Sequence, residues 1–304
     1  MSDSVRTKLQ ASASGQNMRK RQSPKRKKSK KQEQAQKQVV ETVSREYETE
    51  AIEQHANVLF KPNPGPQTDF LAASEREVLY GGSAGGGKSY AMLSDPLRYM
   101  GHPDFSGLLL RHTTEELREL IFKSQELYPK IWPGIKWSER KMQWTAPSGA
   151  RLWMSYLDRD DDVLRYQGLA FSWIGFDELT QWSTPYAWNY MRSRLRSTAP
   201  DLPIFMRATT NPGGRGHGWV KKMFIDPAPY NKAFDATDIE NNEILRYPSG
   251  HAKAGRPLFK RRFIPARLSD NPYLAESGDY EAMLLSLPEQ QRKQLLEGDW
   301  DIKE

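Results

Sequence analysis

A glycine-rich segment stands between an apolar run and a helix-compatible stretch, and it leaves few folds open to this chain. Residues 78–89 read Val-Leu-Tyr-Gly-Gly-Ser-Ala-Gly-Gly-Gly-Lys-Ser, with the spacing Gly82, four residues, Gly87-Lys-Ser. Such glycines let the backbone curl until its N–H groups face phosphate oxygens, and the following helix N-terminus adds partial positive charge. The segment predicts a nucleoside triphosphate site, and the alternative is a glycine-rich surface turn.

Two side chains of this loop, residues 82–89 and here called the P-loop, have separate expected roles. Lys88 would reach the β- and γ-phosphates, and the Ser89 hydroxyl would bind Mg²⁺. The remaining phosphate contacts are predicted to come from Gly82, Ser83, Ala84, Gly85, Gly86 and Gly87.

Apolar runs alternate with helix-compatible segments through the middle of the chain. Runs at 107–111, 171–176 and 203–208 are typical of buried strands, and Thr113 with Glu116 forms a capping box for a helix between the first two. This alternation predicts an α/β fold, a P-loop NTPase with a mostly parallel central sheet flanked by helices.

Composition divides the chain into four expected parts. Residues 1–38 are rich in Ser, Gln, Lys and Arg and are predicted to be a disordered basic tail. Residues 39–60 are expected to form an amphipathic helix and linker, and 61–228 the ATPase domain. Residues 229–304 are too few for a large core of their own, so a small C-terminal subdomain that folds back on the sheet is expected.

The basic balance of the chain comes from its tail. Residues 1–40 hold 12 Lys or Arg against two acids, which gives them a net charge of +10. The whole chain has a net charge of +7, so the other 264 residues carry −3. The tail could bind phosphate backbones without sequence specificity. The alternative is a solvated tail.

Composition also excludes several classes of protein. There is no cysteine, the five histidines are scattered, and no apolar run approaches the roughly 18 residues of a membrane helix. Disulfides, thiolate metal sites and membrane insertion are therefore not expected, and a reducing cytosol fits.

Polar residues follow two of the predicted strands. Asp177-Glu178 ends one, where Asp177 would hold Mg²⁺ through water and Glu178 would polarise the attacking water as general base. Thr209, Thr210 and Asn211 end another and would sense the γ-phosphate at the same sheet edge. The alternatives are a helix N-terminal acid for the first pair and a simple turn before Pro212 for the second group.

Taken in order, these motifs resemble the ATPase domain of phage terminase large subunits, and the resemblance covers about residues 60 to 301. The segments that carry it are Gly-Gly-Ser-Ala-Gly-Gly-Gly-Lys-Ser at 81–89, Trp-Ile-Gly-Phe-Asp-Glu at 173–178, Ala-Thr-Thr-Asn-Pro at 208–212, Ile-Pro-Ala-Arg at 264–267, Asn-Pro-Tyr-Leu at 271–274 and Leu-Leu-Glu-Gly-Asp-Trp-Asp at 295–301. The last three resemble the family's lid and linker.

The resemblance implies a viral DNA-packaging motor that uses ATP and Mg²⁺ to move double-stranded DNA into a procapsid in the host cell cytoplasm. Its implied partners are the portal protein, a small terminase subunit and further copies of the chain in a ring. Gln67 matches the glutamine that reads adenine, and 209–211 match the motif that couples hydrolysis to movement. A neighbour's arginine is expected to enter the site, with Arg165 the candidate and Arg111 the runner-up; for each, the alternative is a surface or DNA-facing arginine.

The family's large subunits also carry a C-terminal nuclease, whereas this sequence stops at Glu304, just after the linker-like segment. Nuclease activity is therefore expected to be absent from this chain or supplied by another one. The acidic run at 160–162 lies inside the ATPase part and is not assigned to metal-dependent cleavage. Two other functions remain open, a P-loop helicase or recombinase and a nucleotide-binding nucleic-acid scaffold without turnover.

Overall fold

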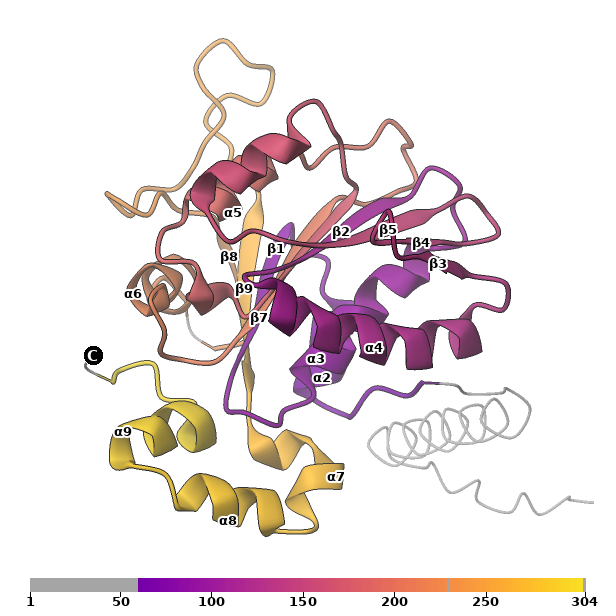
Figure 1. Ribbon diagram of the computed structural model, residues 1–304. Coiled ribbons are helices and arrows are strands. Elements are labelled where there is room, and N and C mark those ends of the chain that lie inside the picture. The colour runs from indigo at the N-terminus through magenta and orange to yellow at the C-terminus, as the bar shows by residue number, and fades with distance from the viewer. Residues whose placement is uncertain (1–59, 229, 303–304) are drawn as a thin grey trace, which may run out of the picture. The chain divides into compact units, whose positions relative to one another are not determined.

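The computed structural model describes residues 60–228 and 230–302 (Figure 1). The tail predicted for 1–38 and nearly all of the helix and linker predicted for 39–60 lie outside these residues. None of the helices in the described ranges has the length and apolar character needed to cross a bilayer.

A mixed sheet of nine strands forms the centre of the described part, in the order β3-β4-β5-β2-β6-β7-β1-β9-β8. The six strands from β5 to β9 in that order pair in parallel, and the antiparallel pairs lie at the two edges. The predicted α/β fold with a mostly parallel sheet is confirmed. The strands are β1 Glu77–Gly82, β2 Ser106–Arg111, β3 Lys136–Ser138, β4 Gln143–Thr145, β5 Arg151–Tyr156, β6 Trp173–Asp177, β7 Phe205–Thr210, β8 Ala233–Asp235 and β9 Lys260–Ala266.

Helices cover both faces of the sheet (Figure 1). Their bounds are α2 Pro66–Ala72, α3 Lys88–Ser94, α4 Thr114–Ile131, α5 Tyr186–Arg192, α6 His217–Val220, α7 Pro272–Ala275, α8 Asp279–Leu285 and α9 Glu289–Arg292. Short 3-10 segments lie at Asp95–Tyr99, Asp160–Tyr166, Leu179–Gln181 and Leu268–Asp270, and π-helical turns at Lys221–Ile225 and Lys293–Glu297. The predicted capping box of Thr113 and Glu116 begins α4.

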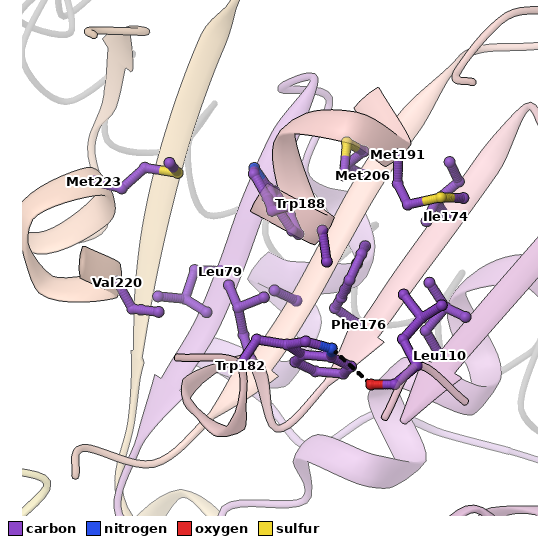
Figure 2. Packing of buried hydrophobic residues seen from close by; sticks show 14 of the residues in the cluster. Leu79, Leu110, Ile174, Phe176, Trp182, Trp188, Met191, Met206, Val220 and Met223 are labelled. Carbon is purple, nitrogen blue, oxygen red and sulfur yellow. Dashed lines mark hydrogen bonds between the residues drawn. The ribbon is translucent and has the colours of Figure 1, made fainter. Parts of the chain in front are cut away.

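Alternation along the strands decides which face each side chain enters. In β2, Leu108 and Leu110 join the core under α5 and α6, whereas Leu109 joins the core under α3 and α4. Figure 2 shows the first of these cores, in which Trp188 lies close to Phe176 and the Trp182 indole N–H donates to the Leu157 carbonyl (3.1 Å). Two apolar faces on each central strand explain why these strands read as continuous apolar runs.

The P-loop follows β1, which lies between β7 and β9. Because β6, β7 and β1 are parallel neighbours, their carboxyl ends lie side by side at the same end of the strands. The boundary expected at 229 falls before two further sheet strands, since β8 and β9 extend the sheet next to β1. The C-terminal helical segment, residues 268–302, begins only after β9. It returns to the P-loop edge, as the contacts below show.

Candidate active site

The glycines of the P-loop are required by backbone conformation and by space. Gly82, Gly85 and Gly87 have φ values of 145°, 78° and 76°, a region that side-chain-bearing residues rarely adopt. A Cβ on Gly82 would lie 2.1 Å from the Ala266 carbonyl oxygen. The loop therefore lies directly against the end of β9, and no larger residue fits at Gly82.

Lys88 begins α3 and points back into the loop. Its Nζ donates to the Ser83 carbonyl oxygen at 2.5 Å, and the side chain is buried. Burial lowers the pKa of Lys88, while the nearby carboxylates of Glu178 and Asp177 oppose that change. The structure thus brings the predicted phosphate-binding lysine into the electrostatic field of the predicted acids.

Asp177 ends β6 and is held by two neighbouring strands. Thr209, its register partner on β7, donates a hydroxyl hydrogen bond to one carboxylate oxygen, Oδ1. The other oxygen, Oδ2, lies 2.8 Å from Nε of Arg111, which ends β2 on the opposite side. All three residues are buried, so the Asp177 carboxylate is fixed in place.

Glu178 is the first residue after β6 and has a left-handed backbone conformation, with φ 61° and ψ 56°. Burial and the adjacent Asp177 raise the pKa of its carboxyl group, and Lys88, Arg111 and a backbone hydrogen bond from Asn211 only partly offset this. A carboxylate with a raised pKa is a stronger base than an ordinary glutamate, as a group that accepts a proton requires. A strained backbone at this position is common at functional sites.

The end of β7 contacts the turn that follows Glu178. The hydroxyl groups of Thr210 and Thr180 are 2.7 Å apart, and the Thr180 N–H donates to the Thr210 hydroxyl at 3.2 Å. The Gly216 N–H in turn donates to the Thr180 carbonyl (2.7 Å). Sequence reasoning missed Thr180, although its place two residues after Glu178 was a usable signal.

Gln67, on α2, contacts the end of the P-loop next to α3. Its side-chain amide donates to the Gly87 carbonyl oxygen (2.9 Å) and accepts from the Asn63 N–H (2.6 Å). It lines a pocket of about 570 Å³ together with Tyr90 and Tyr273. The predicted base-contacting residue and the P-loop thus belong to one continuous site.

Arg165 lies away from these groups. It is in the 3-10 segment after β5, where its guanidinium donates to the Tyr156 carbonyl oxygen (2.7 Å) and the side chain is 45% exposed. Three strands separate β5 from β1. The acids at 160–162 have local partners as well, since Asp162 accepts the backbone N–H groups of Asp158 and Arg159. Within the described ranges no group of three His, Cys, Asp or Glu side chains is arranged to hold a metal.

The C-terminal helical segment contacts the P-loop main chain through one carbonyl and one side chain, contacts that sequence reasoning did not identify. The Ala84 N–H donates to the Leu295 carbonyl oxygen (2.6 Å), and Asn271 Nδ2 donates to the Gly85 carbonyl oxygen (2.6 Å). Beyond the segment's last helical turn, Trp300 is buried and stacks on His217, with ring centroids 5.3 Å apart. His217 is in turn bonded to the loop after β7, because it accepts the Gly213 N–H (2.8 Å).

Ser89 and Asp177 fit the ligand chemistry of Mg²⁺, which prefers hard oxygen donors. The Ser89 hydroxyl is half-buried and makes no hydrogen bond within the described ranges. Asp177 Oδ2 is buried and has no well-aligned hydrogen-bond donor. The Ser89 hydroxyl is thus free to bind a cation, whereas Asp177 Oδ2 faces Arg111 Nε at 2.8 Å, so Asp177 would hold Mg²⁺ through water.

The order and spacing of these groups match a known family. The sequence profile described as "Phage terminase large subunit" matches residues 74–249, which is more than half of the chain and includes the P-loop, Asp177-Glu178 and 209–211. The chain belongs to the phage terminase large subunit family. No curated protein matches the chain.

Solved structures of terminases share the fold. The large terminase of a thermophilic bacteriophage is 15% identical, with a TM-score of 0.55, covering 79% of this chain and 53% of its own. The same protein in complex with ATP-gamma-S is 14% identical, with a TM-score of 0.54 and coverages of 79% and 53%. This chain therefore spans about half the length of the large terminase that it matches.

Proposed function

We propose that this chain is the ATP-hydrolysing motor part of a phage large terminase, which moves double-stranded DNA into a procapsid through its portal. The observation that carries the proposal is the meeting of Lys88, Asp177 and Glu178 at one edge of the sheet, with the pKa of Glu178 raised. A scaffold that only bound nucleotide would have no need of a buried general base. The terminase of the thermophilic bacteriophage, solved with ATP-gamma-S, supports nucleotide binding by this fold.

The chemistry assigned to each residue follows from its position. Lys88 and the P-loop N–H groups bind the phosphates, Gln67 contacts the adenine, and Ser89 with Asp177 holds Mg²⁺, which would neutralise phosphate charge. Glu178 accepts the proton of the attacking water. Arg111 reaches the same acids from within the chain, whereas Arg165 would have to act on a neighbouring subunit.

The remaining partners follow from the family. Copies of the chain would form a ring on the portal in the host cell cytoplasm, aided by a small terminase subunit, and any nuclease activity would come from another chain or domain. The C-terminal helical segment would act as the lid, because its Leu295 and Asn271 contact the P-loop directly.

The deciding experiment measures ATP hydrolysis by the full chain alone, with double-stranded DNA, and with DNA plus purified portal. We expect turnover that the portal and DNA stimulate, and we expect Lys88→Ala to weaken both nucleotide binding and turnover. Strand separation without portal dependence would instead identify a helicase. Tight ATP binding without turnover under any condition would show a scaffold.

A further inference from the structure

The chain between β8 and β9, residues 236–259 and here called the arm, is an extension with its own hydrogen bonds. Near its base the Leu245 N–H donates to the Ala236 carbonyl and the Leu258 N–H to the Leu245 carbonyl, both at 2.8 Å. Farther out, Tyr247 and Arg256 pair through a 3.0 Å bond. In Figure 1 the arm is the light orange part of the chain that extends away from the sheet beyond β8. The arm is therefore an ordered hairpin-like extension held by its own main-chain hydrogen bonds.

A buried ion cluster fastens the arm to the sheet. The guanidinium groups of Arg192 and Arg261 lie 5.4 and 5.7 Å from the ring centre of Phe259, the last residue of the arm. Both arginines bind the buried carboxylate of Glu77 at the start of β1. The base of the arm is thus held by groups from α5, β1 and β9.

The tip of the arm, residues 246–256, carries charge of one sign. It holds Arg246, Lys253 and Arg256, all exposed, and contains no Asp or Glu. None of the three forms an ion pair with any described residue, whereas Lys260 at the base pairs with Asp235 at 3.0 Å. Arg246 donates to the Gly255 carbonyl oxygen within the tip (2.8 Å), but no described acid neutralises any of the three charges.

The acids of the arm lie outside its tip, and aromatic rings pack within the tip. The three acids, Asp238, Glu240 and Glu243, belong to a separate turn that is closed by the Asp238 N–H to Glu243 carbonyl bond (2.7 Å). At the tip, Tyr247 stacks on His251 with centroids 4.5 Å apart, and Lys253 Nζ lies 5.8 Å from the Tyr247 ring. The cations are therefore held on a packed turn.

The arm and the P-loop join the sheet at opposite ends of its strands. β1 and β9 are parallel, with Glu77 opposite Arg261 and Gly82 opposite Ala266, so the arm enters at the amino end of β9 and the P-loop leaves from the carboxyl end of β1. A ligand at the tip would not compete with ATP. The family profile ends at residue 249, inside the tip, so most of the tip, residues 250–256, lies beyond the matched region.

We propose that the arm tip is a contact for the phosphate backbone of double-stranded DNA. This inference rests on the proposed function and names a surface through which the motor holds its substrate. Phosphates line both strands of the duplex, and unpaired Lys and Arg side chains bind them by releasing counterions. Contacts to phosphates carry no sequence information, so this contact would be sequence-independent, as a motor that moves along DNA requires.

The test compares two full-chain variants that lose the same charge. One is R246Q/K253Q/R256Q, and the other is K136Q/R140Q/K141Q, whose exposed cations lie at the β3–β4 edge and have no ion pairs in the described ranges. DNA affinity is measured against salt concentration. Because each phosphate contact contributes about 0.9 to the log–log slope, we expect the arm variant to lose about 2 to 3 units of slope and the control none.

A second readout is local. Amine acylation of Lys253 should be suppressed by double-stranded DNA, while that of Lys141 should not. Equal salt slopes for both variants together with an unprotected Lys253 would overturn the inference, and loss of portal binding in that case would identify a protein-docking arm. ATP turnover is measured in parallel alone, with DNA, and with DNA plus portal, since its absence from the unmodified chain under all three conditions would refute the proposed function while leaving the DNA result to stand or fall separately.

Discussion

Nε of Arg111 lies 2.8 Å from Oδ2 of Asp177, and neither atom has a well-aligned hydrogen-bond partner elsewhere in the described ranges. The pair forms because β2 and β6 are neighbours in parallel register, with Leu110 opposite Phe176. An acid proposed to hold Mg²⁺ is thus already accompanied by a cation of its own chain. Arg111, rather than the more remote Arg165, has the position from which to act within one subunit.

We predict that Arg111→Ala and Arg165→Ala differ in stability. Removing Arg111 leaves Asp177 buried without its counter-charge, which typically costs about 3 to 5 kcal/mol. Arg165 is 45% exposed, so its loss should cost at most about 1 kcal/mol. Urea denaturation of both variants measures the difference. Equal loss of stability in the two would contradict the assigned role of the Arg111–Asp177 pair.

Mixed rings test which arginine acts across subunits. An Arg165→Ala subunit keeps Glu178, and a Glu178→Gln neighbour could supply the missing Arg165, so mixing the two should restore turnover if Arg165 acts in trans. Arg111→Ala mixed with Glu178→Gln should stay inactive because Arg111 serves its own site. Recovery of activity in the second mixture, measured with portal and DNA present, would reverse these assignments.

Glu178→Gln should retain nucleotide binding and lose about 10²- to 10⁴-fold in turnover, the usual contribution of a general base. Glu126→Gln, an exposed change on α4, serves as the matched control. The variant should also be the more heat-stable protein at neutral pH, because it no longer carries a charge that burial and Asp177 disfavour. Unchanged turnover would end the catalytic assignment.

The pH dependence of turnover should report the raised pKa of Glu178. The base works only when it is deprotonated, so the rate falls as the pH is lowered through that pKa, and the acid limb should lie above the ordinary glutamate value of 4.5. A rate profile measured at saturating ATP locates this limb. An acid limb at or below 4.5 would show that another group limits the rate.

Gln67→Ala should weaken ATP binding and reduce the preference for ATP over GTP. Besides the bonds to Gly87 and Asn63, the Gln67 amide keeps a second N–H and a second oxygen lone pair for adenine, and such a paired contact is worth about 1 to 3 kcal/mol. Thr68→Ala is the control, since Thr68 is the next residue and its hydroxyl bonds only to the exposed side of the same turn, at the Asn63 carbonyl. Equal effects on ATP and GTP would refute base recognition by Gln67.

Glu77→Gln should destabilise the fold near neutral pH and much less in acid. Burial alone would raise the pKa of Glu77, but Arg192 and Arg261 outweigh it and hold the pKa below its ordinary value. The stabilisation is therefore present above the unfolded pKa and is lost as the pH falls through the lowered folded pKa. Denaturation of Glu77→Gln, Glu126→Gln and unmodified chain near neutral pH and in acid, below the ordinary glutamate pKa, checks this. A difference that is the same at both pH values would argue against it.

Local patterns predicted much of this fold because they act within one element. The alternation of apolar runs and helices indicated the parallel sheet. A glycine commonly ends a helix, and Gly298 does so here in the αL conformation. Other local signals lost to tertiary pairing. The sequence of residues 184–197 predicts a helix throughout, yet α5 ends at Arg192, and Leu195 forms an isolated bridge with Phe171 just before β6. Ser286 and Glu289 have the spacing of a capping box, but the Ser286 hydroxyl bonds back to the Met283 carbonyl instead.

Contacts between main-chain groups far apart in sequence could not be read from residue types. The Ala84 N–H donates to the Leu295 carbonyl, and the Ser83 N–H and hydroxyl both donate to the Ala266 carbonyl. These bonds depend on how the chain returns to the P-loop. The same holds for Arg111 beside Asp177, which depends on strand order. Strand order is a property of the whole sheet, whereas the motifs that revealed Lys88 and Glu178 are each a few residues long.

The hydrogen bond between the Ala84 N–H and the Leu295 carbonyl would make nucleotide binding by the P-loop sensitive to force on the C-terminal helical segment. A phosphate oxygen and the Leu295 carbonyl would compete for the same N–H group, so nucleotide binding and docking of the C-terminal helical segment oppose each other. Linkage is reciprocal: release of the segment, which breaks this 2.6 Å bond, would raise nucleotide affinity by the same factor by which bound nucleotide weakens docking of the segment. Load on the chain beyond Leu295 would then be sensed as a change in the dissociation constant for ATP.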